Sequence, residues 1–183
     1  MGNIGLLNRT ETVVLIIDLQ ARLMPVIADA TQLFSQVNRL IAGAEILQVP
    51  TIITEQYPQG LGHTATEIQI PTQPLIIEKI SFSCMLSDTI HDKLRTYQAK
   101  SLVLAGVEAH ICVLKTALDA LNNGYEVHIV ADAVSSRRIF DKEIALERLR
   151  QAGAYIATTE MILFQLMNEA GTSEFKQISK LIK

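Results

Sequence analysis

Three residues of this sequence have side chains that could together perform nucleophilic chemistry: a cysteine, an acid and a lysine. Cys112 lies within residues 102–121, LVLAGVEAHICVLKTALDAL, where an apolar run is followed by Gly106 and then by apolar residues at helical spacing. This pattern predicts a buried strand, a sharp turn and a helix whose first turn holds Cys112. Backbone N–H groups and the helix dipole stabilise a thiolate there, and a thiolate is the nucleophilic form of cysteine.

Asp18 and Lys79 follow two other apolar runs. Asp18 comes directly after TVVLII at residues 12–17, and Lys79 ends PLIIEK at residues 74–79. A carboxylate at the end of a buried strand could accept the proton of a thiol, and a nearby lysine favours the thiolate. Each residue also has an ordinary structural interpretation: a small buried apolar cysteine, an acid that caps a helix, and a solvated lysine at a strand end.

The elements that would position these residues alternate along the chain. Apolar runs predict strands at residues 12–18, 51–55, 75–78, 101–105, 126–130 and 155–157. Helical spacing predicts helices at residues 31–47, 87–96, 111–121, 141–152, 159–167 and 173–183. Repeated strand–helix units predict one α/β domain over residues 1–183, a three-layer α/β/α fold around a six-stranded, mostly parallel sheet.

Composition narrows the class of protein. The 183 residues are 49% hydrophobic and 19% charged, which is typical of a compact domain with a substantial core. A formal net charge of -3 gives no reason to expect a nucleic-acid partner, and the apolar runs are too short to span a membrane. There is no secretory signal pattern at the start, and two cysteines make no disulfide framework. We therefore expect a cytoplasmic protein.

Five segments with the three reactive residues resemble a known superfamily. They are LIIDLQ, which contains Asp18, then TEQYPQGLGHT, then KISFSC, which begins with Lys79, then GVEAHICV, which contains Cys112, and VHIVADAVSSR. Together they resemble the isochorismatase-like cysteine hydrolases, and most of all the branch of isochorismatase domain-containing proteins. Nicotinamidases and N-carbamoylsarcosine amidase belong to the same superfamily. The resemblance covers nearly the whole chain and implies the isochorismatase-like hydrolase fold, which is Rossmann-like.

The resemblance also implies a mechanism. Cys112 would attack an amide carbonyl, Asp18 would accept the thiol proton and pass it to the leaving amine, and Lys79 would stabilise charge. Backbone N–H groups of Glu108 and Cys112 would bind the oxyanion, next to a cis peptide bond between Val107 and Glu108. The expected intermediate is a thioester, which water then opens.

Place in the chain indicates residues that would surround a small, neutral or weakly polar substrate. They are Gln20, Gln56, Tyr57, Phe82 and His110. The expected site holds no metal and no cofactor. Nicotinamidases of the superfamily bind a divalent ion through an Asp-x-His pair, and TEQYPQGLGHT lacks that pair, leaving only Glu55, Gln56 and His63 as candidate ligands.

Three functions remain open from the sequence. The favoured one is a cysteine-dependent amidohydrolase, because all three reactive residue types are present. A vinyl ether hydrolase of the isochorismate type relies on the acid and does not need Cys112. A non-catalytic binding or scaffold protein is the third. The resemblance also supports a homo-oligomer, and the amphipathic helices near the C-terminus could form a subunit contact.

Overall fold

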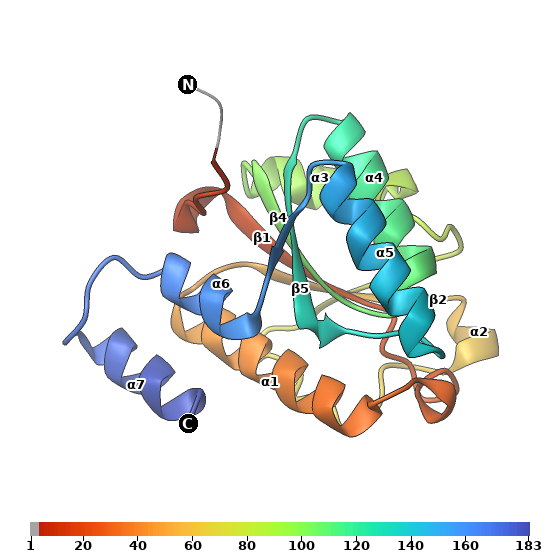
Figure 1. Ribbon diagram of the computed structural model, residues 1–183, viewed down its shortest axis with the longest axis horizontal. Coiled ribbons are helices and arrows are strands. Elements are labelled where there is room, and N and C mark those ends of the chain that lie inside the picture. The colour runs from red at the N-terminus through yellow and green to blue at the C-terminus, as the bar shows by residue number, and fades with distance from the viewer. Residues whose placement is uncertain (1–3) are drawn as a thin grey trace.

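The computed structural model describes residues 4–183, which fold around a six-stranded sheet (Figure 1). Residues 1–3 of the expected 1–183 domain lie outside the described residues. The strands are β1 (Thr12–Ile17), β2 (Thr51–Gln56), β3 (Leu75–Lys79), β4 (Ser101–Gly106), β5 (Glu126–Val134) and β6 (Tyr155–Ala157). Their order across the sheet is β3-β2-β1-β4-β5-β6, and every neighbouring pair is parallel.

Helices cover both faces of the sheet (Figure 1). One face carries α1 (Ala30–Ile46), α6 (Thr159–Gln165) and α7 (Ser173–Leu181). The other carries α3 (Asp88–Thr96), α4 (Leu114–Asn122) and α5 (Ile139–Gln151). This arrangement confirms the predicted three-layer α/β/α fold. A short helix, α2 (Pro58–Leu61), lies in the connection after β2, where the sequence predicted only a loop.

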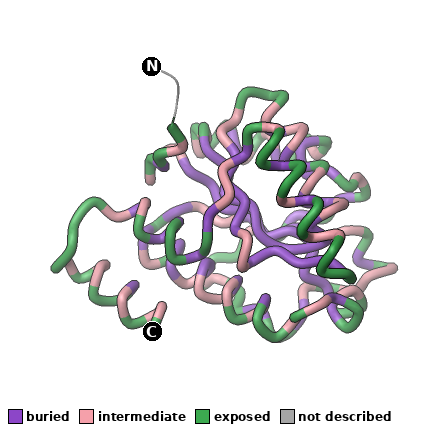
Figure 2. Tube along the Cα trace, in the orientation of Figure 1, coloured by how far each residue is buried: buried purple, intermediate pink, exposed green. Residues whose placement is uncertain are grey.

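The two helix layers explain why the strands read as unbroken apolar runs. Successive side chains of a strand point to opposite faces. In β1, Val14 and Ile16 pack with α1, whereas Val13, Leu15 and Ile17 pack with α3 and α4. All six residues of β1 are consequently buried, and Figure 2 shows the buried sheet between helices whose outer sides are exposed.

Two predicted boundaries differ from the structure by three residues or more, whereas the others differ by at most two. The strand predicted at residues 126–130 continues to Val134, because Val134 pairs with Gly106 after a shift in register, and the Asp132 carboxylate accepts hydrogen bonds from Thr159. The helix predicted from residue 111 is preceded by a π-helical turn at Ala109–Val113, and α4 begins only after it.

The strand order decides where a site can form. β1 lies between β2 and β4, and the order of the strands reverses between β1 and β4. In open parallel sheets, ligands bind at the carboxyl ends of the strands at such a switch point. Within residues 4–183, no helix has both the length and the apolar character needed to cross a bilayer.

Candidate active site

Asp18 lies at the carboxyl end of the central strand. β1 ends at Ile17, and Asp18 turns the chain away from the sheet with a positive φ of 55°. Its side chain is buried and hydrogen-bonded on both oxygens: Oδ1 accepts from the Thr54 hydroxyl at 2.7 Å, and Oδ2 accepts from Lys79 Nζ at 2.7 Å. Thr54 belongs to β2, so the strand between β1 and β3 supplies part of the support.

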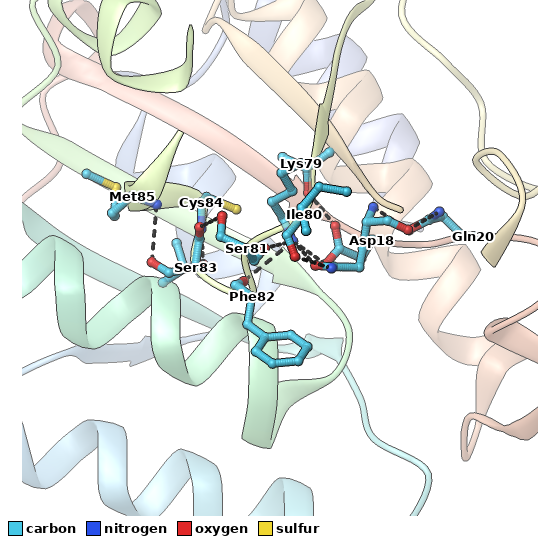
Figure 3. A network of polar contacts seen from close by, with 12 residues as sticks. Asp18, Gln20, Lys79, Ile80, Ser81, Phe82, Ser83, Cys84 and Met85 are labelled. Atoms are coloured by element: carbon cyan, nitrogen blue, oxygen red, sulfur yellow. Dashed lines mark hydrogen bonds and ion pairs between the residues drawn. The ribbon is translucent and has the colours of Figure 1, made fainter. Parts of the chain in front are cut away.

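The Lys79 ammonium lies in the interior, which is rare for lysine unless its charge is paired. Besides Asp18, it donates to Gln56 Oε1 at 2.9 Å and to the backbone oxygens of Ser81 and Phe82 at 3.2 and 3.4 Å. Figure 3 shows Lys79 extended from the end of β3 toward Asp18, above the chain that continues through Ser81. The lysine is therefore fixed by both the carboxylate and the loop that follows it.

Cys112 completes the cluster from β4. Gly106 ends this strand with a φ of 114°, and the π-helical turn then carries Cys112 back over the sheet edge. The side chain is 7% exposed, and its thiol lies close enough to Asp18 for the two groups to shift each other's pKa. The structure thus brings together the three residues that the sequence placed at separate strand ends.

The surroundings of Cys112 favour its neutral thiol over the thiolate. Burial, reinforced by the negative charge of Asp18, raises its pKa to about 12, although Lys79 acts in the opposite direction. The expected stabilisation of a thiolate by the helix end is therefore wrong for the free protein, because desolvation and Asp18 outweigh it. The pair is a thiol poised to pass its proton to a carboxylate.

Asp18 has a raised pKa as well. Burial raises the pKa of this carboxyl above its ordinary value, and the ion pair with Lys79, together with smaller contributions from Thr54 and Cys112, offsets only part of the rise. A carboxylate with a raised pKa is a stronger base, and Asp18 is close enough to Cys112 to shift the pKa of its thiol. The chemistry available at this point is proton transfer followed by sulfur attack.

Glu108 lies at the turn where the oxyanion is expected. The peptide bond between Val107 and Glu108 is cis. The Glu108 carboxylate accepts hydrogen bonds from both N and Nε of Arg137 at 3.0 Å, and two N–H groups of the π-helical turn donate to its carbonyl oxygen. Within residues 4–183 the N–H of Glu108 has no hydrogen-bond acceptor, so this donor is free for a ligand.

Gln20 and Gln56 use their amide groups inside the protein. The buried Gln20 amide accepts from Gln56 N at 2.7 Å and donates to the backbone oxygens of Gln56 and Gly62 at 3.0 and 2.5 Å. The Gln56 amide donates to the backbone oxygen of Ile80 at 2.6 Å and accepts from Lys79. Both were expected beside substrate, and the structure makes them supports of the loop and of Lys79.

The other residues expected around the substrate are more exposed. Tyr57 is 52% exposed, and Phe82 is 60% exposed. His110 precedes Cys112 by two positions, and its Nδ1 lies 2.9 Å from the Ser136 hydroxyl. Phe82 and His110 line one groove together, whereas Tyr57 is not among the residues that line it.

The residues considered as metal ligands lie at the end of β2 and in the loop that follows it. The buried Glu55 carboxylate accepts from N and Oγ1 of Thr64 at 2.7 Å, and its other oxygen lies 2.9 Å from His63 Nδ1. These contacts fasten the loop to the sheet edge, and Glu55 raises the pKa of the exposed His63. In the part of the chain that the structure describes, no three His, Cys, Asp or Glu residues are grouped as metal ligands would be.

Two polar residues of the site were missed by the sequence analysis. Thr54 supports Asp18, and Thr116 on α4 accepts a hydrogen bond from the backbone N–H of Cys84 at 3.0 Å. The available signal was a polar residue within a buried apolar element, as Thr54 is in TIITEQ. Burial also raises the pKa of the Cys84 thiol, to about 11.

Residues 12–161 match the family model of the isochorismatase domain. The chain belongs to the isochorismatase family. It is 46% identical over 152 residues to a Phytophthora sojae protein named secreted isochorismatase effector Isc1, covering 80% of this chain and 72% of that protein. It is 39% identical over 180 residues to isochorismatase domain-containing protein 1 of Danio rerio, covering 98% of this chain but only 64% of that relative.

A solved structure agrees with this family assignment. The structure described as MAR1 ribonuclease from Caenorhabditis elegans is 38% identical, with a TM-score of 0.90, covering 96% of this chain and 91% of that one. The family membership supports hydrolase activity. Because one isochorismatase relative is described as secreted, the cytoplasmic location of this chain stays a prediction.

Proposed function

We propose that this protein is a cysteine-dependent hydrolase that cleaves an amide-type C–N bond of a small molecule through a thioester intermediate. One observation carries the proposal: Asp18 contacts both Lys79 and Cys112 within a buried cluster. A carboxylate paired with a lysine and placed beside a cysteine thiol fits nucleophilic catalysis better than three separate structural roles. The proposed substrate is a small neutral molecule, and the proposed assembly is a homo-oligomer.

The reaction begins with transfer of the Cys112 proton to Asp18 as Sγ attacks the carbonyl carbon. The oxyanion accepts hydrogen bonds from the backbone N–H groups of Glu108 and Cys112, and such donors contribute about 3 kcal/mol each in a transition state. The C–N bond then breaks, and Asp18 protonates the leaving amine. Asp18 then deprotonates a water molecule, which attacks the thioester and releases a carboxylic acid. The Cys112 sulfur takes the proton back from Asp18, and Lys79 stabilises the Asp18 carboxylate throughout.

The Asp18→Asn variant should separate thiol acidity from catalysis. We expect the Cys112 pKa to fall below its value of about 12, because the repelling charge of Asp18 is lost while Lys79 remains. Hydrolysis should nevertheless be lost, because no base receives the proton. The measurement is the rate of Cys112 alkylation against pH in a Cys84→Ser background, beside amine release from a panel of amides. A Cys112 pKa that is unchanged or higher in the variant would contradict the role given to Asp18.

The Cys112→Ala variant distinguishes the amidohydrolase from a vinyl ether hydrolase. We expect amide hydrolysis to fall by about 1000-fold or more, because no other group in the cluster can form the thioester. A vinyl ether reaction of the isochorismate type needs only the acid and should survive in Cys112→Ala. Product formation from both substrate classes by the wild type and the variant decides between the two functions.

Two further alternatives have their own tests. A non-catalytic binding protein predicts that no member of the amide panel is turned over, whatever residue stands at position 112. Because the Caenorhabditis elegans structure is described as a ribonuclease, the protein should also be assayed for cleavage of single-stranded RNA. The charges here favour a neutral substrate over a polyanion, because Lys79 and Arg137 are already paired with Asp18 and Glu108.

A further inference from the structure

An open groove of about 230 Å³ lies along the outer side of α4 and of the π-helical turn that precedes it and holds Cys112. Six residues line it: Phe82, His110, Ile111, Leu114, Lys115 and Leu118. Positions 111, 114, 115 and 118 have the spacing of one helix face, and the exposed Phe82 ring forms the opposite wall. Figure 3 shows this ring pointing away from the polar network around Lys79.

Two residues that line the groove are directly linked to the reactive cluster. The backbone oxygen of Phe82 accepts a hydrogen bond from Lys79 Nζ at 3.4 Å, so this wall is attached to the lysine. On the other wall, Ile111 directly precedes Cys112 in the π-helical turn. A substrate bound over Cys112 can therefore extend one substituent into the groove.

The lining presents carbon atoms rather than free charges. Lys115 Nζ is held by both oxygens of Asp119 at 2.9 and 3.2 Å. His110 Nδ1 is engaged by the hydroxyl of Ser136. What remains is the apolar surface of leucine, isoleucine and phenylalanine side chains. This surface favours an apolar ligand group, because binding removes the apolar surface of the group from water.

We propose that this groove binds an apolar alkyl or aryl substituent of the amide that Cys112 attacks. Its volume accommodates about seven or eight non-hydrogen atoms at ~30 Å³ each. The inference rests on the proposed function and deepens it, since it names the substrate class as amides with an apolar side group. Phe82, Leu114 and Leu118 are then residues that determine substrate specificity.

A series of N-alkyl chloroacetamides tests the assignment without a known substrate. Cys112 sulfur forms a bond to the methylene carbon, chloride leaves with the C–Cl electrons, and the thiol proton passes to base. In a Cys84→Ser background at one fixed pH, the rate should rise at least about tenfold from the N-methyl to the N-butyl probe, because three more methylene groups are buried. Equal rates for all probes overturn the groove assignment.

Two tryptophan variants make the comparison specific. Leu118→Trp fills the groove and should bring the ratio of butyl to methyl rates close to one. Met161→Trp is the matched control, because Met161 is 50% exposed on α6 across the sheet, and this variant should keep the ratio of the parent protein. A ratio that stays high in Leu118→Trp places the alkyl group elsewhere and overturns the proposal.

The remaining outcomes separate the failure of each idea. If Cys112 reacts with no probe at any pH, the proposed function fails and the groove assignment fails with it. If Cys112 reacts equally with all probes, only the groove assignment fails. Sedimentation of the parent and of Leu118→Trp tests whether a second copy of the chain occupies the groove. A change in oligomer mass would make the groove a subunit interface and overturn the proposal.

Discussion

Replacing Gly106 by alanine is expected to lower the free energy of unfolding by about 4 kcal/mol or more, a large part of the stability of an ordinary domain. An added Cβ would lie 2.1 Å from the backbone oxygen of Ile17 and 2.6 Å from its nitrogen. Ile17 pairs with Gly106 in the centre of the sheet, so neither strand can move without breaking the β1–β4 pairing. The φ of 114° adds strain for any residue with a side chain.

Gly124→Ala is the control for this substitution. Gly124 also has a positive φ, 83°, but an added Cβ there meets nothing within 4 Å. Only the conformational cost of about 1–2 kcal/mol should remain. Chemical denaturation of both variants separates steric collision from backbone conformation. Similar losses of stability in the two would show that the contact with Ile17 relaxes at little cost.

Lys79→Met is expected to destabilise the fold by about 3–5 kcal/mol at pH 7, because it leaves the carboxylate of Asp18 buried without its counter-charge. Hydrolysis should be lost as well, since Cys112 would face that negative charge alone. The loss of stability should depend on pH. Burial already raises the Asp18 pKa, and without Lys79 the rise is larger, so the folded variant prefers the protonated acid.

The sign of the pH dependence follows from that preference. A carboxyl whose pKa is raised by folding contributes most stability below its unfolded pKa of about 3.9, and this contribution is lost as pH rises through the folded pKa. The loss of unfolding free energy in Lys79→Met should therefore become smaller as the pH is lowered. Arg150→Met is the control, because its ion pair with Glu147 is exposed and contributes at most about 1 kcal/mol. A deficit for Lys79→Met that is independent of pH would contradict the buried charge as its cause.

The local pattern of the chain was sufficient to predict the layers of the fold. Runs such as TVVLII and SLVLAG are buried throughout and almost entirely apolar because helices cover both faces of their strands. The alternation of such runs with helical spacing then required parallel strands and helix crossovers. Where pairing across the sheet set a boundary, as for Val134 opposite Gly106, the local pattern ended the strand too early.

The sequence by itself placed Asp18, Lys79 and Cys112 at the ends of strands, since each follows an apolar run. Only the tertiary structure decided that they meet, because the order β3-β2-β1-β4 depends on pairing between distant segments. It also decided the protonation of Cys112, whose pKa depends on burial and on the charge of Asp18 rather than on its place in a helix. The uses of the Gln20 and Gln56 amides and the groove beside α4 have the same origin: each needs atoms from segments that only folding brings into contact.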